Sequence, residues 1–215
     1  MLIHNMNTAR TKVIMKFPTY YDKIAKIKLF DPLADILGSS EDGTFEFSFA
    51  DAVRFAGHGC PTVGGAYLMT YFGLKALYQE EVPTRGMIEV QMNQAKDQGT
   101  TGVIASVVGS IVGASDEGGF KGLGGQFYRN NLIKFSQNFL GSLKLVRIDT
   151  REHIIMEYNP HLISGDPMTG ILLEKILQNV ATAEDKQMFS AIWNRRLEAI
   201  MVNEFFNPKL ITAKK

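Results

Sequence analysis

The sequence predicts an α+β fold in which a mixed or antiparallel sheet is flanked by helices and followed by a C-terminal helical pair. Residues 87–92 alternate apolar and polar side chains, the period of a strand with one buried face. Residues 61–78 carry apolar side chains at helical intervals nearly all round, which predicts a central helix. Two helix-start signals after residue 165 predict the pair. We therefore divide the chain into a core over 1–165 and a helical extension over 166–215.

The N-terminal part is expected to be helical first. Apolar and basic residues recur at helical spacing over 20–30. Asp31 followed by Pro32 then marks a cap and a first-turn proline for a short helix ending at Leu37. The sequence GSSEDG, residues 38–43, breaks the chain.

The middle of the chain alternates between strands and helices. Alternation of phenylalanine with polar residues over 45–49 predicts a strand, and a short helix over 49–55 leads to the central helix. The run 103–112 fits a strand or a helix by periodicity, and its glycines and small residues favour a closely packed helix.

A glycine-rich loop, residues 113–125, precedes three strand-like segments that resemble an antiparallel meander, at 127–135, 143–148 and 153–158. The loop lacks both the P-loop pattern and a dinucleotide fingerprint, so we interpret it as a lid or a dimer loop.

The C-terminal pair comprises a helix that starts at Asp166–Pro167 and ends near Val180, and a helix that ends near Val202. Thr182 and Asp185 resemble a capping box for the second helix. Trp193 is expected to pack on the sheet or on another subunit, and Arg195 and Arg196 to lie on the solvated face.

Composition narrows the class of protein. The 215 residues are 45% hydrophobic and carry a formal net charge of +1, with basic residues dispersed, so neither nucleic acid nor a membrane surface is an expected partner. The single cysteine excludes an intramolecular disulfide, and we find no export signal or apolar stretch long enough to span a bilayer. A cytoplasmic protein is expected.

The chemistry is expected at the turn that precedes the central helix. Pro61 suits the first helical position, which places Cys60 at the cap, where unpaired N–H groups and the helix dipole favour a thiolate. Gly57 and Gly59 leave the backbone free to bring His58 and Cys60 toward one point. These two side chains are the candidate catalytic residues and metal ligands.

The run FAGHGCPTVGGAYLMT, residues 55–70, resembles the signature of the FmdE-like proteins, a family named after one component of formylmethanofuran dehydrogenase. The matching positions are Phe55, Gly57, His58, Cys60 and Pro61. The resemblance implies an α+β core, a tendency to form homodimers, and metal or redox chemistry near the His-x-Cys turn. The chain lacks the second cysteine and the C-terminal zinc ribbon of many such proteins, so a four-cysteine zinc site is not carried over.

Three functions remain open for this turn. The first is a transition-metal site, most simply zinc, that needs further ligands; Asp97 is the leading candidate, followed by His153, His161 or residues of a second subunit. Cys60 could instead bind haem iron. The second is covalent catalysis with Cys60 as nucleophile and His58 or another histidine as base. The third is a carrier or assembly protein without turnover.

We predict that the protein binds a small molecule or metallocofactor, with enzymatic turnover left open. Beyond the ligand pair, Gly57, Gly59, Asp97 and Arg129 are the candidate cofactor-binding residues, Arg129 through an anionic ligand. The open side of the site is expected to face the loop 113–125.

Overall fold

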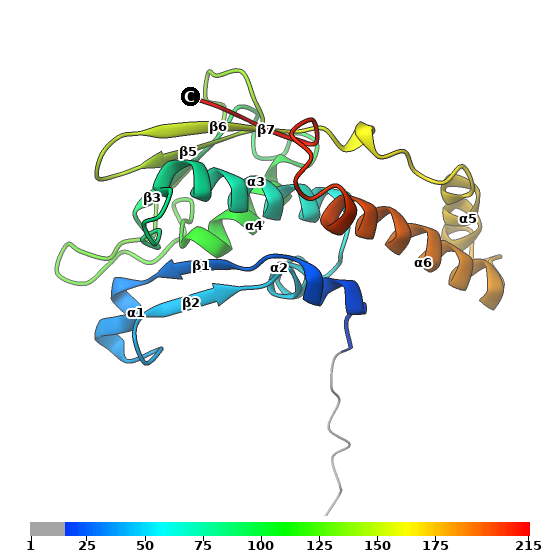
Figure 1. Cartoon of the computed structure of the whole chain (residues 1–215), viewed down its shortest axis with the longest axis horizontal. Helices are drawn as coiled ribbons and strands as arrows, with labels where there is room; N and C mark the ends of the chain where they lie inside the picture. Colours follow the sequence, from blue (N-terminus) through cyan, green and yellow to red (C-terminus); the bar gives the residue numbers. More distant parts are fainter. Residues whose placement is uncertain (1–15) are drawn as a thin grey trace, which may run out of the picture.

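A computed structural model describes residues 16–215 and confirms the α+β class. Helix α3 (Pro61–Tyr78) lies at the centre, with a five-stranded sheet on one side and a two-stranded hairpin on the other (Figure 1). Twelve of its eighteen residues are buried, as the apolar character of its whole circumference predicts. Its start and end coincide with the predicted ones.

The main sheet has the order β4-β3-β5-β6-β7. Neighbouring strands are antiparallel from β3 (Ile88–Met92) through β5 (Leu143–Arg147) and β6 (His153–Tyr158) to β7 (Ile211–Lys214). Strand β4 (Ile133–Lys134) instead runs parallel to β3. The predicted three-strand meander is therefore only partly correct. The segment 127–135 contributes only two strand residues. Leu132 donates its N–H to Ser115 in the 113–125 loop and accepts the N–H of Val90 in β3. The segment therefore pairs with β3, and not with β5 as the meander would require. Strand β7 has no counterpart among the predicted elements.

The predicted helix over 20–30 is wrong. This segment forms a 3₁₀ turn (Thr19–Lys23) and strand β1 (Ile27–Phe30), which pairs antiparallel with β2 (Thr44–Phe47). Burial alternates along β1, with Ile27 buried and Lys28 exposed, so a period of two describes this segment better than a helical period. The pairing partner lies beyond the 38–43 turn, and a local pattern cannot show it.

The predicted positions of three further helices are confirmed. Helix α1 (Pro32–Leu37) is capped by the Asp31 carboxylate, which accepts the N–H groups of Leu33 and Ala34 at 3.0 and 3.2 Å. Helix α2 (Phe49–Ala56) leads into the turn before α3. Helix α4 (Thr101–Val112) packs along α3 and confirms the helical interpretation of the 103–112 run.

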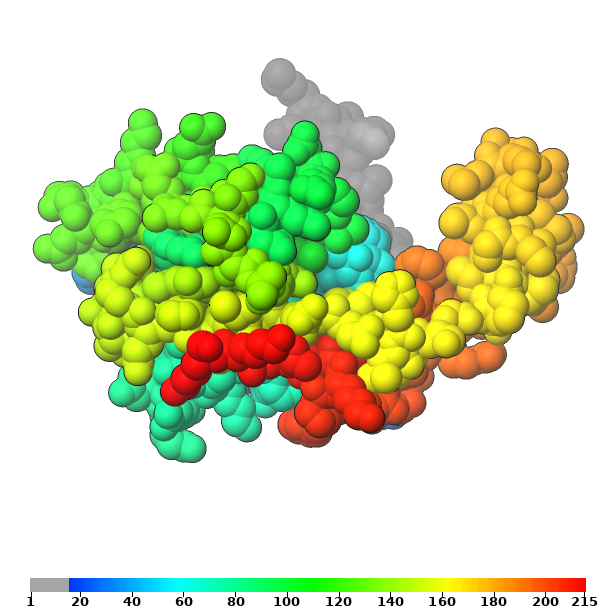
Figure 2. Space-filling view, turned by 90° about the horizontal axis from the view of Figure 1, so that it is seen from above, coloured from blue at the N-terminus to red at the C-terminus, as the bar shows by residue number. Residues whose placement is uncertain are grey.

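The C-terminal pair consists of α5 (Met168–Leu177) and α6 (Ala183–Glu198), and α6 continues as a π-helical turn (Ala199–Asn203). The Thr182–Asp185 capping box is present. The two helices form a hairpin, here called the arm, that projects from the body and leaves a hollow between α5 and the rest of the molecule (Figure 2). The chain then returns to the core sheet as β7. None of the helices in residues 16–215 combines the length and apolarity needed to cross a bilayer.

Candidate functional site

The turn between α2 and α3 is held from both of its ends. Gly57 caps α2 in the left-handed region, with φ of 77°, and donates its N–H to Val53 at 2.8 Å. A side chain is strained in this conformation, which explains a glycine here. Three residues later Cys60 adopts the extended backbone of an N-cap for α3. The two helix ends therefore fix the path of residues 57–60.

Cys60 lies at the predicted cap of α3. Its side chain is buried, and Sγ accepts the backbone N–H of Val63 at 3.4 Å. The first turn of the helix carries no acidic residue that would repel a thiolate. The helix N-terminus thus offers the sulfur a hydrogen bond and a favourable dipole.

His58 is exposed, and its Nδ1 lies 3.0 Å from the carbonyl oxygen of Ala56. A carbonyl can only accept, so Nδ1 must carry the proton in the neutral ring, which leaves the lone pair on Nε2. A backbone carbonyl bonded to one ring nitrogen is the usual way in which proteins orient a histidine ligand.

Helix α6 also contacts the turn, through Trp193. Trp193 Nε1 donates to the carbonyl oxygen of Gly59 at 2.9 Å, and its ring stacks on Phe189 with centroids 5.6 Å apart. The packing role predicted for Trp193 is therefore accompanied by a direct hydrogen bond to the residue before Cys60. The arm and the turn are mechanically connected through this bond.

A cavity of about 670 Å³ opens above the turn, a size within the usual range for sites that bind small molecules. We call it the Cys60 cavity. Besides the turn, α3, α4, α6, the end of β3 and the end of β6 contribute to its wall. Its lining residues are His58, Cys60, Pro61, Thr62, Met69, Met92, Asn93, Gln94, Thr100, Thr101, Ile104, Ser142, Tyr158, Pro160, Trp193 and Arg196.

Tyr158 and Arg196 are two polar residues of this wall that were not among the predicted site residues. The Tyr158 hydroxyl is buried and has no hydrogen-bond partner within residues 16–215. Arg196 donates through Nε to Ile163 O at 2.9 Å and through Nη2 to Pro160 O at 3.1 Å. The expectation that Arg196 lies on a solvated face is wrong, because the side chain turns inward to these carbonyls while Arg195 remains exposed.

Electrostatics keep Tyr158 protonated. Burial raises the pKa of the Tyr158 hydroxyl above its usual range, the charge of Arg196 opposes this rise, and Cys60 adds to it. At neutral pH the phenol is therefore a neutral hydrogen-bond donor that lies in the same cavity as a thiol and a guanidinium.

The predicted additional metal ligands lie away from the cavity wall. Asp97 is exposed in the turn before α4, although its neighbours Gln94 and Thr100 line the cavity. His153 begins β6 and lines a separate small pocket, about 16 Å along the strand from Tyr158. His161 is exposed beside Pro160. No group of three or more His, Cys, Asp or Glu side chains suited to a metal ion occurs within the part of the chain that the structure describes.

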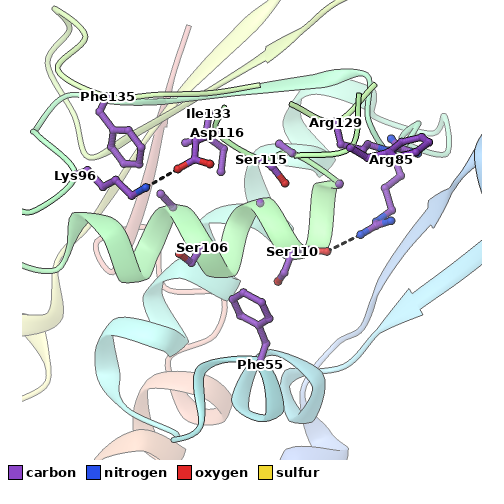
Figure 3. A pocket seen from close by; sticks show the side chains of 15 residues that line it. Phe55, Arg85, Lys96, Ser106, Ser110, Ser115, Asp116, Arg129, Ile133 and Phe135 are labelled. Atoms are coloured by element: carbon purple, nitrogen blue, oxygen red, sulfur yellow. Dashed lines mark hydrogen bonds and ion pairs between the residues drawn. The ribbon is translucent and has the colours of Figure 1, made fainter. Parts of the chain in front are cut away.

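Arg129 occupies a different place. It is buried and pairs with Asp31 at 2.6 Å, and Asp31 also accepts Arg85 at 2.8 Å. Both arginines line a second cavity of about 370 Å³ beside α4, shown in Figure 3. The start of the 113–125 loop lines this second cavity too, and none of the residues that line the Cys60 cavity in residues 16–215 belongs to that loop. The structure therefore brings together His58, Cys60, Gly57 and Gly59, and separates them from Asp97 and Arg129.

No signal in the sequence places Tyr158 and Arg196 beside Cys60, since they come from β6 and α6, both far from Cys60 along the chain. No family model, curated protein or solved structure matches this chain.

Proposed function

We propose that the Cys60 cavity binds a divalent transition metal together with a small chelating molecule, with Cys60 Sγ and His58 Nε2 as the protein's ligands. The observation that carries this proposal is that one soft and one borderline donor residue, two positions apart, line the same cavity, which is large enough for a ligand. The resemblance of residues 55–61 to the FmdE-like proteins agrees with it.

The donor set favours a metal site that a bound molecule completes. It does not favour a closed structural site in which the protein supplies every ligand. Zinc usually takes four ligands, or three and a water. The described residues supply two at this turn, so the remaining positions fall to the bound molecule, or to a second subunit. The metal would polarise groups of the bound molecule, and the chain would position them.

Cobalt(II) provides the sharpest test, because zinc has a filled d shell and gives no visible spectrum, whereas cobalt–thiolate absorption reports a sulfur ligand directly. Cys60 is the only cysteine, so such absorption is assigned without ambiguity. We expect Cys60→Ser to abolish this absorption and His58→Gln to weaken cobalt binding. His161→Gln, an exposed histidine outside the cavity wall, is the matched control and should bind like the wild type.

The same experiment separates the alternatives. A Soret band in purified protein would replace the proposed complex with haem bound through Cys60. If neither cobalt nor haem binds at Cys60, the metal proposal is wrong.

A cysteine nucleophile is the second candidate, favoured by the hydrogen bond from Val63 N–H to Sγ. Fast alkylation of Cys60 at neutral pH that does not change when cobalt is added would support this function over metal binding.

We also propose that the protein forms a homodimer through the arm. Several large apolar side chains of the arm are exposed, among them Ile171 at 53%, Leu177 at 72% and Val180 at 64%. Several exposed large apolar side chains on one segment are a feature of interfaces.

A further inference from the structure

Arg196 differs from the other arginines that are shielded from solvent. Arg85 and Arg129 pair with Asp31, and Arg147 pairs with Glu81 and Asp149. Arg196 is half-buried and has no carboxylate within 4.0 Å in residues 16–215, and the nearby Asp166 carboxylate lies toward Arg195 instead. A half-buried guanidinium whose acceptors are all neutral keeps its charge available for an anionic ligand.

The guanidinium is also held in place. Its bonds to the carbonyl oxygens of Pro160 and Ile163 use Nε and Nη2, and both acceptors are neutral. Nη1 and the second N–H of Nη2 have no partner among the described residues. Tyr158 lines the same cavity, and its hydroxyl is a buried polar atom that lacks a partner in residues 16–215.

The position of Tyr158 is set by close packing on α3. A methyl group added at Gly65 would lie 2.2 Å from Tyr158 Cδ1, so the ring rests directly on the backbone one turn after Cys60. The phenol thus lies against the helix whose N-terminus carries the candidate metal ligand.

We propose that Arg196 and Tyr158 bind the carboxylate of a small organic acid in the Cys60 cavity. This inference rests on the proposed function in that it names the chemical class of the molecule bound beside Cys60. One carboxylate has two oxygens and one negative charge, which match two side chains with free donors and one unpaired positive charge. A phosphate dianion would require more positive charge than this wall provides.

The rest of the cavity suits the body of such an acid. Met69, Met92 and Ile104 provide apolar surface, and Trp193 provides an aromatic ring. An aryl or branched aliphatic acid would bury its apolar part there and leave its carboxylate at Arg196, and a second donor group on the same molecule would bind the metal at Cys60.

The test measures binding of benzoate, acetate, benzamide and inorganic phosphate to the full chain by saturation-transfer NMR and competition. We expect benzoate to bind, acetate to bind more weakly, and benzamide and phosphate not to compete. Tyr158→Phe removes one donor to a charged group, so benzoate affinity should fall about tenfold or more. Arg196→Gln should abolish benzoate binding.

Tyr78→Phe is the matched control. The Tyr78 hydroxyl is likewise buried without a hydrogen-bond partner in residues 16–215, but it lies beside Arg147, outside the Cys60 cavity. This variant should bind benzoate like the wild type. Tyr158→Phe keeps the ring that packs on α3 and should fold like the wild type. The test therefore remains decisive even if Arg196→Gln does not fold.

Three results would overturn the inference: unchanged benzoate affinity in Tyr158→Phe, equal competition by benzamide or phosphate, or no binding of either carboxylate. The cobalt–thiolate absorption and the benzoate binding are measured separately, so the metal proposal and this inference can fail independently. If wild-type protein shows no cobalt–thiolate absorption but binds benzoate through Tyr158, only the metal proposal fails. If the absorption is present and benzoate binding ignores Tyr158, only the carboxylate inference fails.

Discussion

Trp193 shows how one side chain of the arm restrains the candidate site. Its Nε1 donates to Gly59 O, one residue before Cys60. Trp193→Phe keeps an aromatic ring against Phe189 and removes this donor, so the half-buried Gly59 carbonyl loses its partner. We expect a loss of about 1 kcal/mol in the free energy of unfolding, measured by urea denaturation, and faster alkylation of Cys60. Phe189→Leu alters the stack and keeps the bond, so unchanged alkylation in that variant is the control.

Asp31 is the residue on which the N-terminal hairpin and the 113–135 region depend. The residue is 3% exposed, and its carboxylate caps α1 and accepts both Arg85 and Arg129. Asp31→Asn leaves two shielded guanidinium groups without a counter-charge. We expect a loss of about 3–5 kcal/mol in unfolding free energy. Glu46→Gln, which breaks the exposed pair with Lys26, should leave stability unchanged.

The same carboxylate predicts a pH dependence. Burial alone raises the pKa of Asp31, but the hydrogen bond from Arg85 and the charge of Arg129 outweigh it, so the pKa in the folded protein is lowered. The folded state therefore binds this proton less readily than the unfolded chain. The stabilisation is complete above the unfolded pKa of about 3.9 and is lost as pH falls through the lower folded value. Acid titration followed by circular dichroism should show a smaller slope below pH 4 in Asp31→Asn than in the wild type.

At this scale the sequence is informative where the signal is local. Pro61 predicts the cap at Cys60, and Pro32 predicts the cap at Asp31, because a first-turn proline fixes the residue before it. The pairing of Asp31 with Arg129 spans 98 positions and has no local signature. The same holds for Tyr158 and Arg196, whose roles depend on how β6 and α6 meet at the cavity.

At the scale of elements, glycines on α3 and α5 make a matched comparison. Gly65→Ala on α3 places a methyl group 2.2 Å from the Tyr158 ring, whereas Gly170→Ala on α5 meets no atom of residues 16–215 within 4 Å. We expect Gly65→Ala to destabilise the fold by about 1–3 kcal/mol and to weaken ligand binding in the Cys60 cavity. Gly170→Ala should stabilise it by about 0.5–1 kcal/mol. Thermal unfolding of both variants checks this, and equal shifts would contradict the packing argument.

Helices with their own start signals agree with the sequence, whereas strands β1 and β7 do not. Helices α1, α3 and α6 each begin at a cap that the sequence shows. Strand β1 depends on β2 for its hydrogen bonds, and β7 depends on β6. Their apolar patterns are too short to distinguish a strand from another conformation before the partner is known.

At the scale of the whole molecule, the arm keeps apolar side chains exposed that contacts within one chain do not bury. Its two helices contact each other, and Lys175 pairs with Asp185 across them at 3.0 Å. Leu172 is buried between them, yet neighbouring apolar side chains face outward. The hollow between the arm and the body (Figure 2) would let a second copy contact the arm close to the Cys60 cavity.

This arrangement predicts the oligomeric state. We expect the wild type to have twice the mass of one chain in light scattering coupled to size-exclusion chromatography, because burial of the arm's apolar side chains drives association. Leu177→Glu places a charge in that interface and should give a monomer. Leu140, which is 89% exposed on a loop outside the arm, supplies the control, since Leu140→Glu should remain dimeric. A wild type that stays monomeric at high concentration, or a Leu140→Glu variant that dissociates as Leu177→Glu does, would show that the arm is not the dimer interface.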